Sequence, residues 1–544
     1  MTGDDPLEES ESGEPTTGEP LTDGGAAGAD DVALDPWGSS SVSDYRKLFE
    51  EFGIEEFDEV VAEVPNPHYL MRRGVIFGHR DYRPVARALR DGEPAAVLSG
   101  FMPTGDPHIG HKLVFDEIIW HQQQGADAYA LIADLEANSA RGMSWEDIDE
   151  HARDYLLSLL ALGFDVEEGT LYRQSTNREL QDLAFELGAE ANFSELQAIY
   201  GFDGETDVSH MQSVVTQVAD ILYPQLEEPK PTVIPVGPDQ DPHVRLARDL
   251  AERMRFFGVT EAYASFELED DERVVVADAY RKLEEMAGEN DEIRCLDAVE
   301  LIEDGPEAVS FDDRDRPEET VAAAADAPAE TRAVAKLKNA GMEPLRPRTR
   351  FFDRRATDEA FEALIGAIEG EKRVYENHID AFETDRTDAE DLARAVEVDT
   401  GGYGFQPPSS IYHRFMTGLT GGKMSSSVPA SHISLLDDPE AGYDKVKAAT
   451  TGGRETAEEQ REKGGRADEC PVYELYAYLL AGDDDEFAKR VYDECVGGER
   501  LCGDCKEQAA QLMREFLKEH QEKREQVVDL LEAADIELES PRRR

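Results

Sequence analysis

Apolar stretches of strand length alternate with segments of helical spacing between residues 95 and 236, and this alternation constrains the fold more than any other feature. The strand patterns are Ala95–Phe101, Tyr129–Asp134, a shorter one near Leu171, and Thr232–Val236; the helical patterns are His108–Trp120 and Tyr155–Leu162. Strands that alternate with helices favour a parallel sheet covered by helices. We therefore predict an α/β fold whose ligands bind at the carboxyl ends of the strands.

Two motifs follow directly after predicted strands. His108-Ile109-Gly110-His111 begins the first helix, and Gly237-Pro238-Asp239-Gln240-Asp241-Pro242-His243 follows the last strand. Two histidines three residues apart at a helix start can face one ligand, while the N-terminal amides point at phosphate. Gly110 leaves room for a flat base to pack on the backbone. Four letters alone fit a turn with incidental histidines equally well, but the preceding strand and its Pro103-Thr104-Gly105 loop favour a nucleotide site.

A third motif, Lys423-Met424-Ser425-Ser426-Ser427, follows Gly421 and Gly422. A lysine in such a loop suits a mobile cation that closes on a triphosphate, and the serine hydroxyls can donate hydrogen bonds to phosphate oxygens. Taken alone, the loop would carry no functional meaning. Together, the three motifs describe a site that activates a carboxylate with ATP.

The charge of the chain is extreme, with 55 Lys and Arg against 120 Asp and Glu and a formal net charge of −65. Hydrophobic residues still make up 40%, which excludes a disordered acidic protein for most of the length. We interpret the chain as a globular protein adapted to concentrated salt. An acidic surface without a basic patch would repel RNA in dilute salt. At about 1 M salt the Debye length is about 3 Å, so this long-range repulsion is screened and the lack of a basic patch is weak evidence against RNA binding.

The 544 residues exceed what one hydrophobic core holds, which is roughly 250–300 residues. We divide the chain into an acidic disordered tail at 1–43, an N-terminal helical region at 44–94, a catalytic domain at 95–265, an acidic insertion at 266–406, the completion of the catalytic domain at 407–439, and a helical domain at 440–544. The acidic Pro/Ala-rich part of the insertion, 303–332, is expected to be solvated. No apolar segment reaches 18 residues and no signal sequence is present, so we expect a soluble, cytoplasmic protein without membrane association.

With these motifs the sequence resembles the class I aminoacyl-tRNA synthetases, and specifically the archaeal and eukaryotic tryptophanyl-tRNA synthetases. The resemblance covers most of 44–265 and 407–540, and its specific elements are Leu70 to Asp81, Asp239 to His243 with Arg245, Arg248 and Asp249, and Gly452 to Thr456. It implies a Rossmann-like catalytic domain, a helical anticodon-binding domain and a homodimer. The implied reaction is ATP-dependent activation of L-tryptophan, with Mg²⁺ as counter-charge, followed by transfer to tRNA(Trp).

The resemblance also implies roles for individual residues. The carboxylate of the amino acid is itself the nucleophile, so positioning and charge stabilisation carry the rate. Lys423, His108 and His111 are the catalytic candidates. The ATP-binding candidates are Thr104, His108, Gly110, His111, Gly237, Asp239, Lys423, Met424, Ser425, Ser426 and Ser427.

For the amino acid, the resemblance places Glu136, Gln217 and Gln240 at the ammonium and carboxylate. Each is also compatible with a polar residue that has no ligand. Leu98 and Leu131 stand where the eukaryotic enzymes carry a tyrosine and a glutamine that contact the indole nitrogen. Other groups must then read the indole, or the substrate differs.

Four of the five cysteines cluster late, at Cys470, Cys495, Cys502 and Cys505, with 24, 6 and 2 residues between successive members. Thiolates at this spacing can bind zinc or an iron–sulfur cluster, and some tryptophanyl-tRNA synthetases carry a four-iron cluster on a similar pattern. Four reduced, buried cysteines are the alternative.

Two other functions remain open from the sequence. One is a tyrosyl-tRNA synthetase, which would differ in the amino acid that stimulates pyrophosphate exchange. The other is a synthetase-like paralogue that senses tryptophan or binds RNA. Intact His108, His111, Asp239, Gln240 and Lys423 argue against the paralogue, because a binding module needs no lysine that closes on phosphate.

Overall fold

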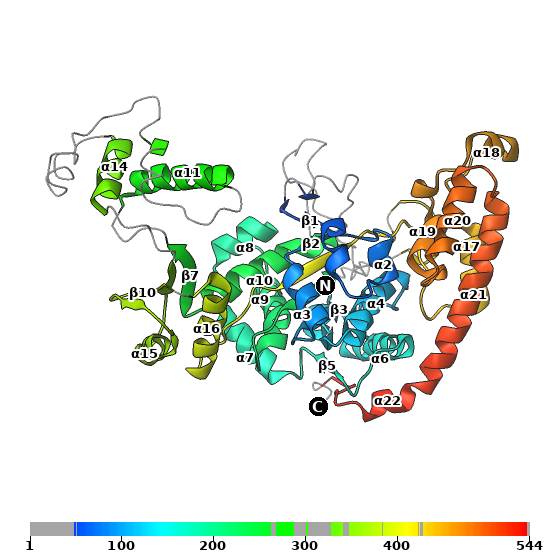
Figure 1. The fold of residues 1–544 in the computed structure, drawn as a ribbon. Helices are drawn as coiled ribbons and strands as arrows, with labels where there is room; N and C mark the ends of the chain where they lie inside the picture. The colour runs from blue at the N-terminus through cyan, green and yellow to red at the C-terminus, as the bar shows by residue number, and fades with distance from the viewer. Residues whose placement is uncertain are drawn as a thin grey trace, which may run out of the picture.

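The computed structural model describes residues 48–49, 52–262, 268–287, 301–302, 328–340, 348–382, 384–422, 424 and 428–540. The predicted tail at 1–43 and most of the acidic stretch at 303–332 lie outside these residues. Figure 1 shows a central α/β body, with a helical region at its C-terminal side and a smaller sheet at the opposite side. No helix in the described part of the chain is long and apolar enough to cross a membrane.

The central body is built on a seven-stranded sheet in the order β1-β2-β11-β6-β3-β4-β5. Its strands are β1 (Glu55–Glu56), β2 (Ile76–Arg80), β3 (Ala96–Phe101), β4 (Asp127–Ile132), β5 (Gly169–Arg173), β6 (Thr232–Val236) and β11 (Ser409–His413). The five strands from β11 to β5 run parallel, which confirms the predicted fold class. The two strands β1 and β2 pair antiparallel at one edge.

The chain order reverses at β3, because β4 and β5 lie on one side of it and β6 on the other. Such a switch point opens a crevice at the carboxyl ends of the strands. The motifs after β3 and β6 therefore meet at one place, although more than 120 residues separate them.

Helices cover both faces of this sheet (Figure 1). They are α2 (Tyr69–Arg72), α3 (Arg83–Asp91), α4 (Ile109–Gln123), α5 (Asp134–Arg141), α6 (Trp145–Leu162), α7 (Arg178–Leu187), α8 (Phe193–Tyr200), α9 (Val208–Leu222) and α10 (Asp241–Arg253). Side chains alternate along a strand, so Val97 packs with α4 and α6 while Leu98 packs with α7, α9 and α10. Leu131 of β4 faces the same side as Leu98.

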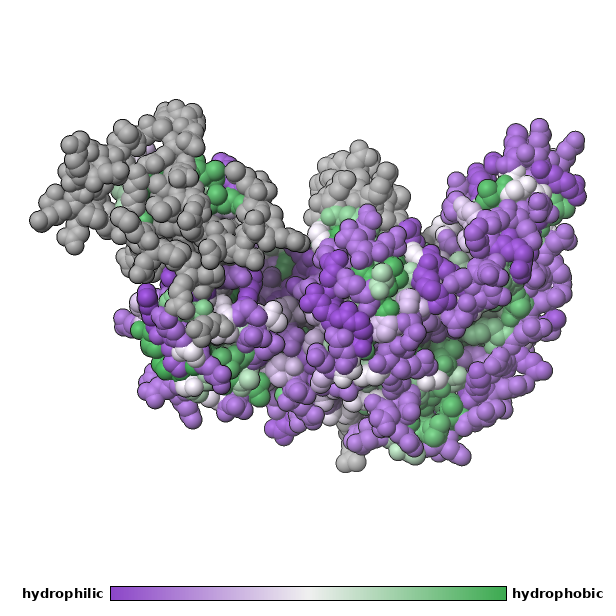
Figure 2. Space-filling model, in the orientation of Figure 1, coloured by the Kyte–Doolittle hydropathy of each residue, from purple (hydrophilic) through white to green (hydrophobic). Residues whose placement is uncertain are grey.

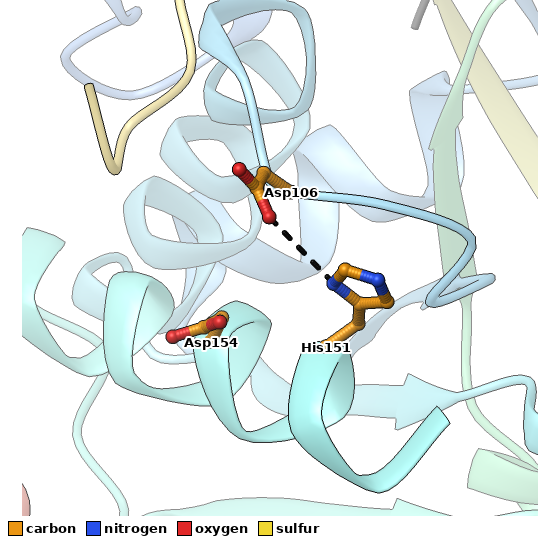
Figure 3. Close-up of side chains that lie close together, drawn as sticks. All are labelled: Asp106, His151 and Asp154. Carbon is orange, nitrogen blue, oxygen red and sulfur yellow. Dashed lines mark ion pairs between the residues drawn. The ribbon is translucent and has the colours of Figure 1, made fainter. Parts of the chain in front are cut away.

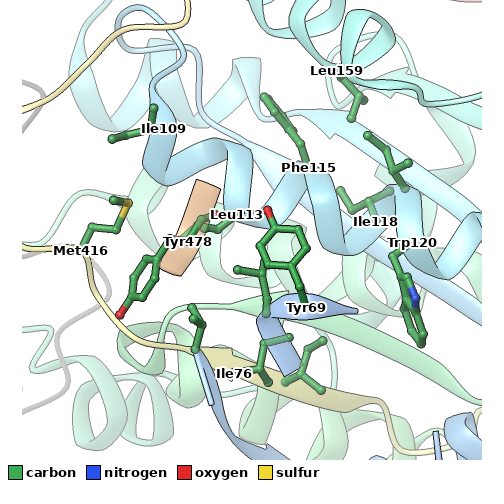
Figure 4. Close-up of a cluster of buried hydrophobic side chains, with 14 of the residues drawn as sticks. Tyr69, Ile76, Ile109, Leu113, Phe115, Ile118, Trp120, Leu159, Met416 and Tyr478 are labelled. Carbon is green, nitrogen blue, oxygen red and sulfur yellow. Dashed lines mark hydrogen bonds between the residues drawn. The ribbon is translucent and has the colours of Figure 1, made fainter. Parts of the chain in front are cut away.

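The helical C-terminal region consists of α17 (Pro439–Ala448), α18 (Ala457–Lys463), α19 (Pro471–Leu475), α20 (Asp485–Val496), α21 (Cys502–Gln526) and α22 (Val528–Ala533). Its buried side chains share one hydrophobic cluster with α2, α4 and α6. Figure 4 shows part of this cluster, in which Tyr478 of the helical region lies beside Leu113, Tyr69 and Met416. The helical region and the catalytic body are therefore joined by a common core.

The expectation of a helical region at 44–94 is wrong in part. Strand β2 lies within it and is hydrogen-bonded to β11, so this stretch completes the main sheet. Residues 76–80 are almost wholly buried on both faces of the sheet. Such a strand has no alternating pattern to distinguish it from a buried helical segment.

The insertion also differs from the prediction, because it forms a second sheet in the order β7-β8-β10-β9. The strands are β7 (Phe257–Ala262), β8 (Arg348–Asp353), β9 (Lys372–Val374) and β10 (His378–Ala381), with helices α15 (Asp358–Ala367) and α16 (Arg386–Asp399) packed on them. Strand β7 was expected within the catalytic domain. Two further helices, α11 (Asp270–Ala287) and α14 (Ala329–Ala340), pack on each other.

The molecular surface agrees with the extreme charge of the sequence. Figure 2 shows a face covered mainly by hydrophilic residues, with small hydrophobic patches between them. A few large apolar side chains are nevertheless exposed, of which Phe185 on α7 is the most accessible at 83%.

Candidate active site

Two cavities open at the switch point of the main sheet and share Ser99, Gly100, Val236 and Gln240. One has a volume of about 250 Å³ and lies on the α9 side. The other, of about 480 Å³, lies against the start of α4. Two adjoining cavities of this kind suit two substrates that react where the cavities meet.

The larger cavity is lined by His108, Gly110, His111, Gly237 and Asp239. The structure thus brings together the residues predicted to bind ATP from the first two motifs. Thr104 is exposed and is not among the lining residues, so this candidate lies outside the cavity. Arg141 and Phe415 also line it and were not predicted; neither belongs to a motif that the sequence analysis singled out.

The start of α4 is fixed by its two histidines. His108 is the N-cap residue, and its Nδ1 accepts a hydrogen bond from the Gly110 amide at 3.1 Å. His111 Nδ1 accepts from the His108 amide, also at 3.1 Å. Because Nδ1 accepts in both rings, the proton of each neutral imidazole is on Nε2.

Burial keeps both imidazoles neutral. It lowers the pKa of His108 well below its usual value, and it lowers the pKa of His111 to about 4. His111 Nε2 donates to Tyr155 Oη at 3.2 Å. The two rings lie 3.9 Å apart between centroids, so they form one neutral block at the cavity wall, in which His111 donates to Tyr155 and the Nε2 of His108 is the remaining donor.

The structure gives a second reason for a glycine at position 110, besides the predicted space for a base. A Cβ at this position would lie 2.9 Å from His108 Cε1 and 3.0 Å from its Nδ1. Any side chain there would push the capping ring away from the Gly110 amide. The glycine therefore preserves the position of His108.

The loop of the third motif is described only at Met424, while Lys423, Ser425, Ser426 and Ser427 lie outside the described residues. Met424 lines the larger cavity, and its Sδ lies 3.8 Å from the Cβ position of Gly110. The segment after the loop is hydrogen-bonded to the first motif, with the Ile109 amide donating to Ile433 O and the Leu435 amide to Pro107 O. The first and third motifs are thus adjacent.

The smaller cavity has apolar walls and a buried polar end. The walls include Leu98, Leu131, Ile221, Ile234 and Val236. The polar end is a hydrogen-bonded set of Glu136, Gln174, Gln217 and Asp220. A cavity with apolar walls and a few convergent polar groups is typical of a small-molecule site.

Glu136 is 1% exposed and accepts from Gln174 Nε2 at 3.0 Å and from Gln217 Nε2 at 2.7 Å. Burial raises its pKa to about 7, against these two hydrogen bonds. The Oε1 atoms of Gln174 and Gln217 are buried and have no hydrogen-bond partner among the described residues. One carboxylate and two unpaired carbonyl oxygens match the three donors of an ammonium group.

Asp220 is the second carboxyl of this cavity. Its Oδ1 accepts from Tyr172 Oη at 2.9 Å and its Oδ2 accepts from Gln174 Nε2 at 2.7 Å. Burial raises its pKa well above the usual value. Sequence reasoning missed Asp220 and Gln174. The only signal for Asp220 was one acid within the otherwise apolar end of α9, and Gln174 follows β5 with no motif around it.

Gln240 lines both cavities, and its Nε2 lies 3.4 Å from Asp239 Oδ2. Asp241, Arg80 and Arg248, which belong to the elements of the resemblance, have another role. Arg80 pairs with the fully buried Asp241 at 2.8 Å, and Arg248 pairs with Asp81 at 3.3 Å. These pairs tie β2 to α10 and do not line either cavity.

The four late cysteines line one small pocket together with Gly452, Gly453 and Arg500. A Cβ at Gly453 would lie 2.5 Å from Cys502 Sγ, and one at Gly465 would lie 2.7 Å from Cys495 Sγ. The two glycines therefore make space for the sulfurs. Burial raises the pKa of Cys505 to about 11 and that of Cys495 above its usual value, so these thiols would bind a metal only with release of their protons.

The spacing of these sulfurs discriminates between metals. A zinc ion with four bonds of about 2.3 Å needs thiolates about 3.8 Å apart. No three of the four sulfurs, all of which are described, lie within 4.8 Å of one another. The four sulfurs are therefore spaced more widely than the ligands of a zinc tetrahedron.

A different set of ligand-type groups lies within 4.8 Å in the described chain, namely Asp106, His151 and Asp154. Figure 3 shows Asp106, from the loop after β3, facing His151 of α6 at 3.6 Å. Asp154 is engaged by Arg524 of α21 at 2.6 Å. We interpret this set as a contact between the loop after β3, α6 and α21, and assign no metal to it.

Comparison with known proteins agrees with this geometry. The family model for class I tRNA synthetases of the W and Y type matches residues 90–265 and 387–518. The chain is 70% identical over 516 residues to "Tryptophan--tRNA ligase 1" of Halobacterium salinarum, covering 95% of this chain and 98% of that one. The chain belongs to the tryptophanyl-tRNA synthetases.

Further relatives extend the similarity. "Tryptophan--tRNA ligase" of Methanosarcina acetivorans is 47% identical over 500 residues, covering 91% of this chain and 96% of that one. The crystal structure of tryptophanyl-tRNA synthetase from Aeropyrum pernix K1 aligns with a TM-score of 0.60 at 30% identity, covering 94% of this chain and all of that one. These findings confirm the recognition from motifs, and they do not favour the tyrosyl alternative or the non-enzymatic paralogue.

Proposed function

We propose that this synthetase joins L-tryptophan to ATP at the junction of the two cavities and then transfers the amino acid to tRNA(Trp). The observation that carries the proposal is the pair of adjoining cavities, one bordered by two neutral histidines and one ended by a buried carboxylate with unpaired amide oxygens. Family membership supplies the reaction, and the cavities supply the placement of each substrate.

In this proposal ATP occupies the larger cavity. His108 offers an Nε2 donor that develops no charge of its own, His111 lies beside it with its own Nε2 on Tyr155, and the positive end of the α4 dipole attracts phosphate. Lys423 and the serines of its loop approach the phosphates from the adjacent segment, with Mg²⁺ as further counter-charge. Because the tryptophan carboxylate attacks the α-phosphorus directly, these residues act by holding the phosphates in line and not by removing a proton.

Tryptophan occupies the smaller cavity, with its ammonium on Glu136, Gln174 and Gln217. The indole lies between Leu98, Leu131 and Ile234, none of which can accept a hydrogen bond from its N–H. We infer that Asp220 is the acceptor, because it is the buried carboxyl of the same cavity and each of its oxygens keeps a free lone pair.

The test of the substrate placement is ATP–pyrophosphate exchange in molar KCl with tryptophan, tyrosine and phenylalanine. We expect exchange with tryptophan alone, and loss of that exchange in Lys423→Ala. A tryptophan analogue with sulfur in place of the indole N–H tests Asp220, because wild type should discriminate against it and Asp220→Ala should not. Equal discrimination in both proteins would exclude Asp220 as the acceptor.

We also propose a four-iron cluster on Cys470, Cys495, Cys502 and Cys505. When bound, a cluster of this kind would cross-link the helical region. Anaerobically purified protein should be brown and contain about four irons per chain. One zinc and no colour would instead support a tetrahedral site.

The helical region at 440–544 is proposed to bind the anticodon arm.

The enzyme is also proposed to act in the cytoplasm as a homodimer. The candidate dimer interface is formed by exposed apolar side chains of three successive helices, Phe185 (83%), Phe193 (41%) and Val208 (77%). Sedimentation of Phe185→Glu in molar KCl should show a monomer where wild type shows a dimer.

A further inference from the structure

The last segment of the described chain, residues 534–540, leaves the helical region and returns to the catalytic body. Figure 1 shows the chain beyond α22 running back toward β5. Ile536 and Leu538 pack against the main hydrophobic cluster, and Ser540 is only 4% exposed. A terminal segment that is buried this far has specific contacts to explain it.

Those contacts converge on one arginine. Arg173, at the end of β5, is 1% exposed and its Nη1 donates to the Leu538 carbonyl oxygen at 2.9 Å. Its Nε donates to Asp134 Oδ2 at 2.9 Å, and its Nη2 forms an ion pair with Asp149 Oδ1 at 2.8 Å. The Ser540 amide then donates to both oxygens of Asp149, at 3.1 Å each.

Arg173 and Asp134 directly adjoin the amino-acid cavity. Asp134 begins α5, and Glu136 lies two residues further along the same helix. Gln174, which donates to Glu136 and to Asp220, is the residue after Arg173. Asp134 also holds the next residue, accepting from the Ser175 amide at 3.0 Å. Gln174 therefore follows a residue that the C-terminal segment contacts, and Glu136 lies on the helix that begins at the Asp134 partner of that residue.

We propose that residues 538–540 act as a clasp that positions the tryptophan ammonium site from the far end of the chain. The clasp holds Asp149 and Arg173, and Arg173 in turn holds Asp134. Arg173 ends β5 and precedes Gln174, whereas Asp134 begins the helix that carries Glu136. Together these two residues set the distance between Gln174 and Glu136. Arg173 and Asp149 are positioning residues in this scheme, since neither lines the cavity. The inference rests on the proposed tryptophan site.

Helix α6 gives the clasp its rigidity. Asp149, Asp154 and Ser158 lie on it, and Arg524 of α21 donates to Asp154 Oδ1 at 2.6 Å and to Ser158 Oγ at 2.5 Å. The C-terminal part of the chain thus contacts α6 at two positions. Arg524 binds Asp154 and Ser158, and Ser540 binds Asp149. Movement of the helical region would therefore act on α6 and, through Asp149 and Arg173, on the ammonium site.

The test removes a single donor. Ser540→Pro deletes the amide hydrogen that Asp149 accepts, whereas Ser540→Ala keeps it and removes only a hydroxyl that has no partner among the described residues. We expect the KM for tryptophan in pyrophosphate exchange to rise about 5- to 50-fold in the proline variant, a range typical of coupling between separate sites. The KM for ATP and the thermal midpoint should change little, and the alanine variant should behave as wild type.

A parallel rise in both KM values, or equal behaviour of the proline and alanine variants, would overturn the clasp. Asp149→Asn provides a second measurement if the proline variant does not fold, because it retains the acceptor oxygen and loses the charge that orients Arg173. It should raise the tryptophan KM with the ATP KM unchanged, and no such split would also refute the proposal. Absence of tryptophan-dependent exchange in wild type would refute the proposed function instead.

Discussion

Glu136 ought to make tryptophan binding depend on pH near neutrality. Its pKa is raised to about 7 by burial, so the carboxyl of the ligand-free enzyme is mostly protonated below that pH. The ammonium of tryptophan needs the ionised form. At pH 6 about one tenth of the molecules are ionised, and the KM for tryptophan should be about tenfold above its value at pH 8. Burial also raises the pKa of the neighbouring Asp220 well above its usual value, so a Glu136 variant is needed to assign the titration.

The substitution Glu136→Gln removes this charge and keeps the shape. A hydrogen bond to a charged group contributes about 1.5–3 kcal/mol, so the tryptophan KM at pH 8 should rise about 10- to 150-fold. The pH dependence of the KM between pH 6 and 8 should disappear. The exposed Glu150 of α6 offers a matched control, since Glu150→Gln removes the same charge at a residue that lines neither cavity.

The free energy of unfolding should depend on pH in the opposite direction to tryptophan affinity, because it should fall where the affinity rises. Between pH 4.5 and about 7 the native state keeps a proton that the unfolded state has lost, so the free energy of unfolding falls as pH rises through this window. Above pH 7 the cost reaches about 3 kcal/mol. Glu136→Gln should therefore stabilise the ligand-free protein by up to about 3 kcal/mol at pH 8 and have little effect near pH 4.5. Denaturant unfolding at the two pH values measures this.

Two results would refute the reasoning. One is a wild-type tryptophan KM that is constant from pH 6 to pH 8. The other is a Glu136→Gln variant whose tryptophan KM lies within a factor of two of wild type. A variant that lost both affinity and stability would show that Glu136 is a structural group.

Three further predictions concern glycines and the insertion. Gly110→Ala should lower kcat/KM for ATP about 10- to 100-fold, because its Cβ would displace His108; Gly105→Ala, with open space around it, should have no such effect in the same exchange assay. Gly453→Ala would place a Cβ 2.5 Å from Cys502 Sγ and should abolish bound iron measured by metal analysis, while Gly503→Ala should retain it. Removal of residues 303–327 should leave pyrophosphate exchange within about twofold of wild type, since the cavities are lined by other parts of the chain; loss of exchange would show that this segment serves the site.

The deletion range follows from a correction that the structure makes. The acidic stretch was expected to extend to residue 332, but Arg332 belongs to α14 and donates to the buried Glu272 of α11 at 2.9 Å. Cutting at 332 would leave Glu272 with Lys336 as its remaining cationic partner among the contacts that the structure describes. A deletion that ends at 327 avoids this loss.

The sequence by itself determined the parallel sheet, the ATP motifs and the family. Each of these depends on short-range information, namely apolar runs of strand length, glycines that permit close approach, and histidines that cap a helix through their own neighbours. His108 and Gly110 illustrate this, because their partners lie within three residues. Local patterns of this kind are visible in one chain without knowledge of its tertiary contacts.

Only the tertiary structure decided which polar residues meet at the end of the smaller cavity. Gln174 and Asp220 are unremarkable in sequence, and they meet because β5 and α9 bring them to one cavity, where Gln174 bonds to Glu136 at 38 residues and to Asp220 at 46 residues along the chain. Strand β2 was misread because a strand buried on both faces has no alternation. The clasp joins Arg173 to Leu538 across 365 residues, and no pattern within the chain encodes such a contact. What decided these features was burial, which turns an ordinary polar residue into one that must find a partner.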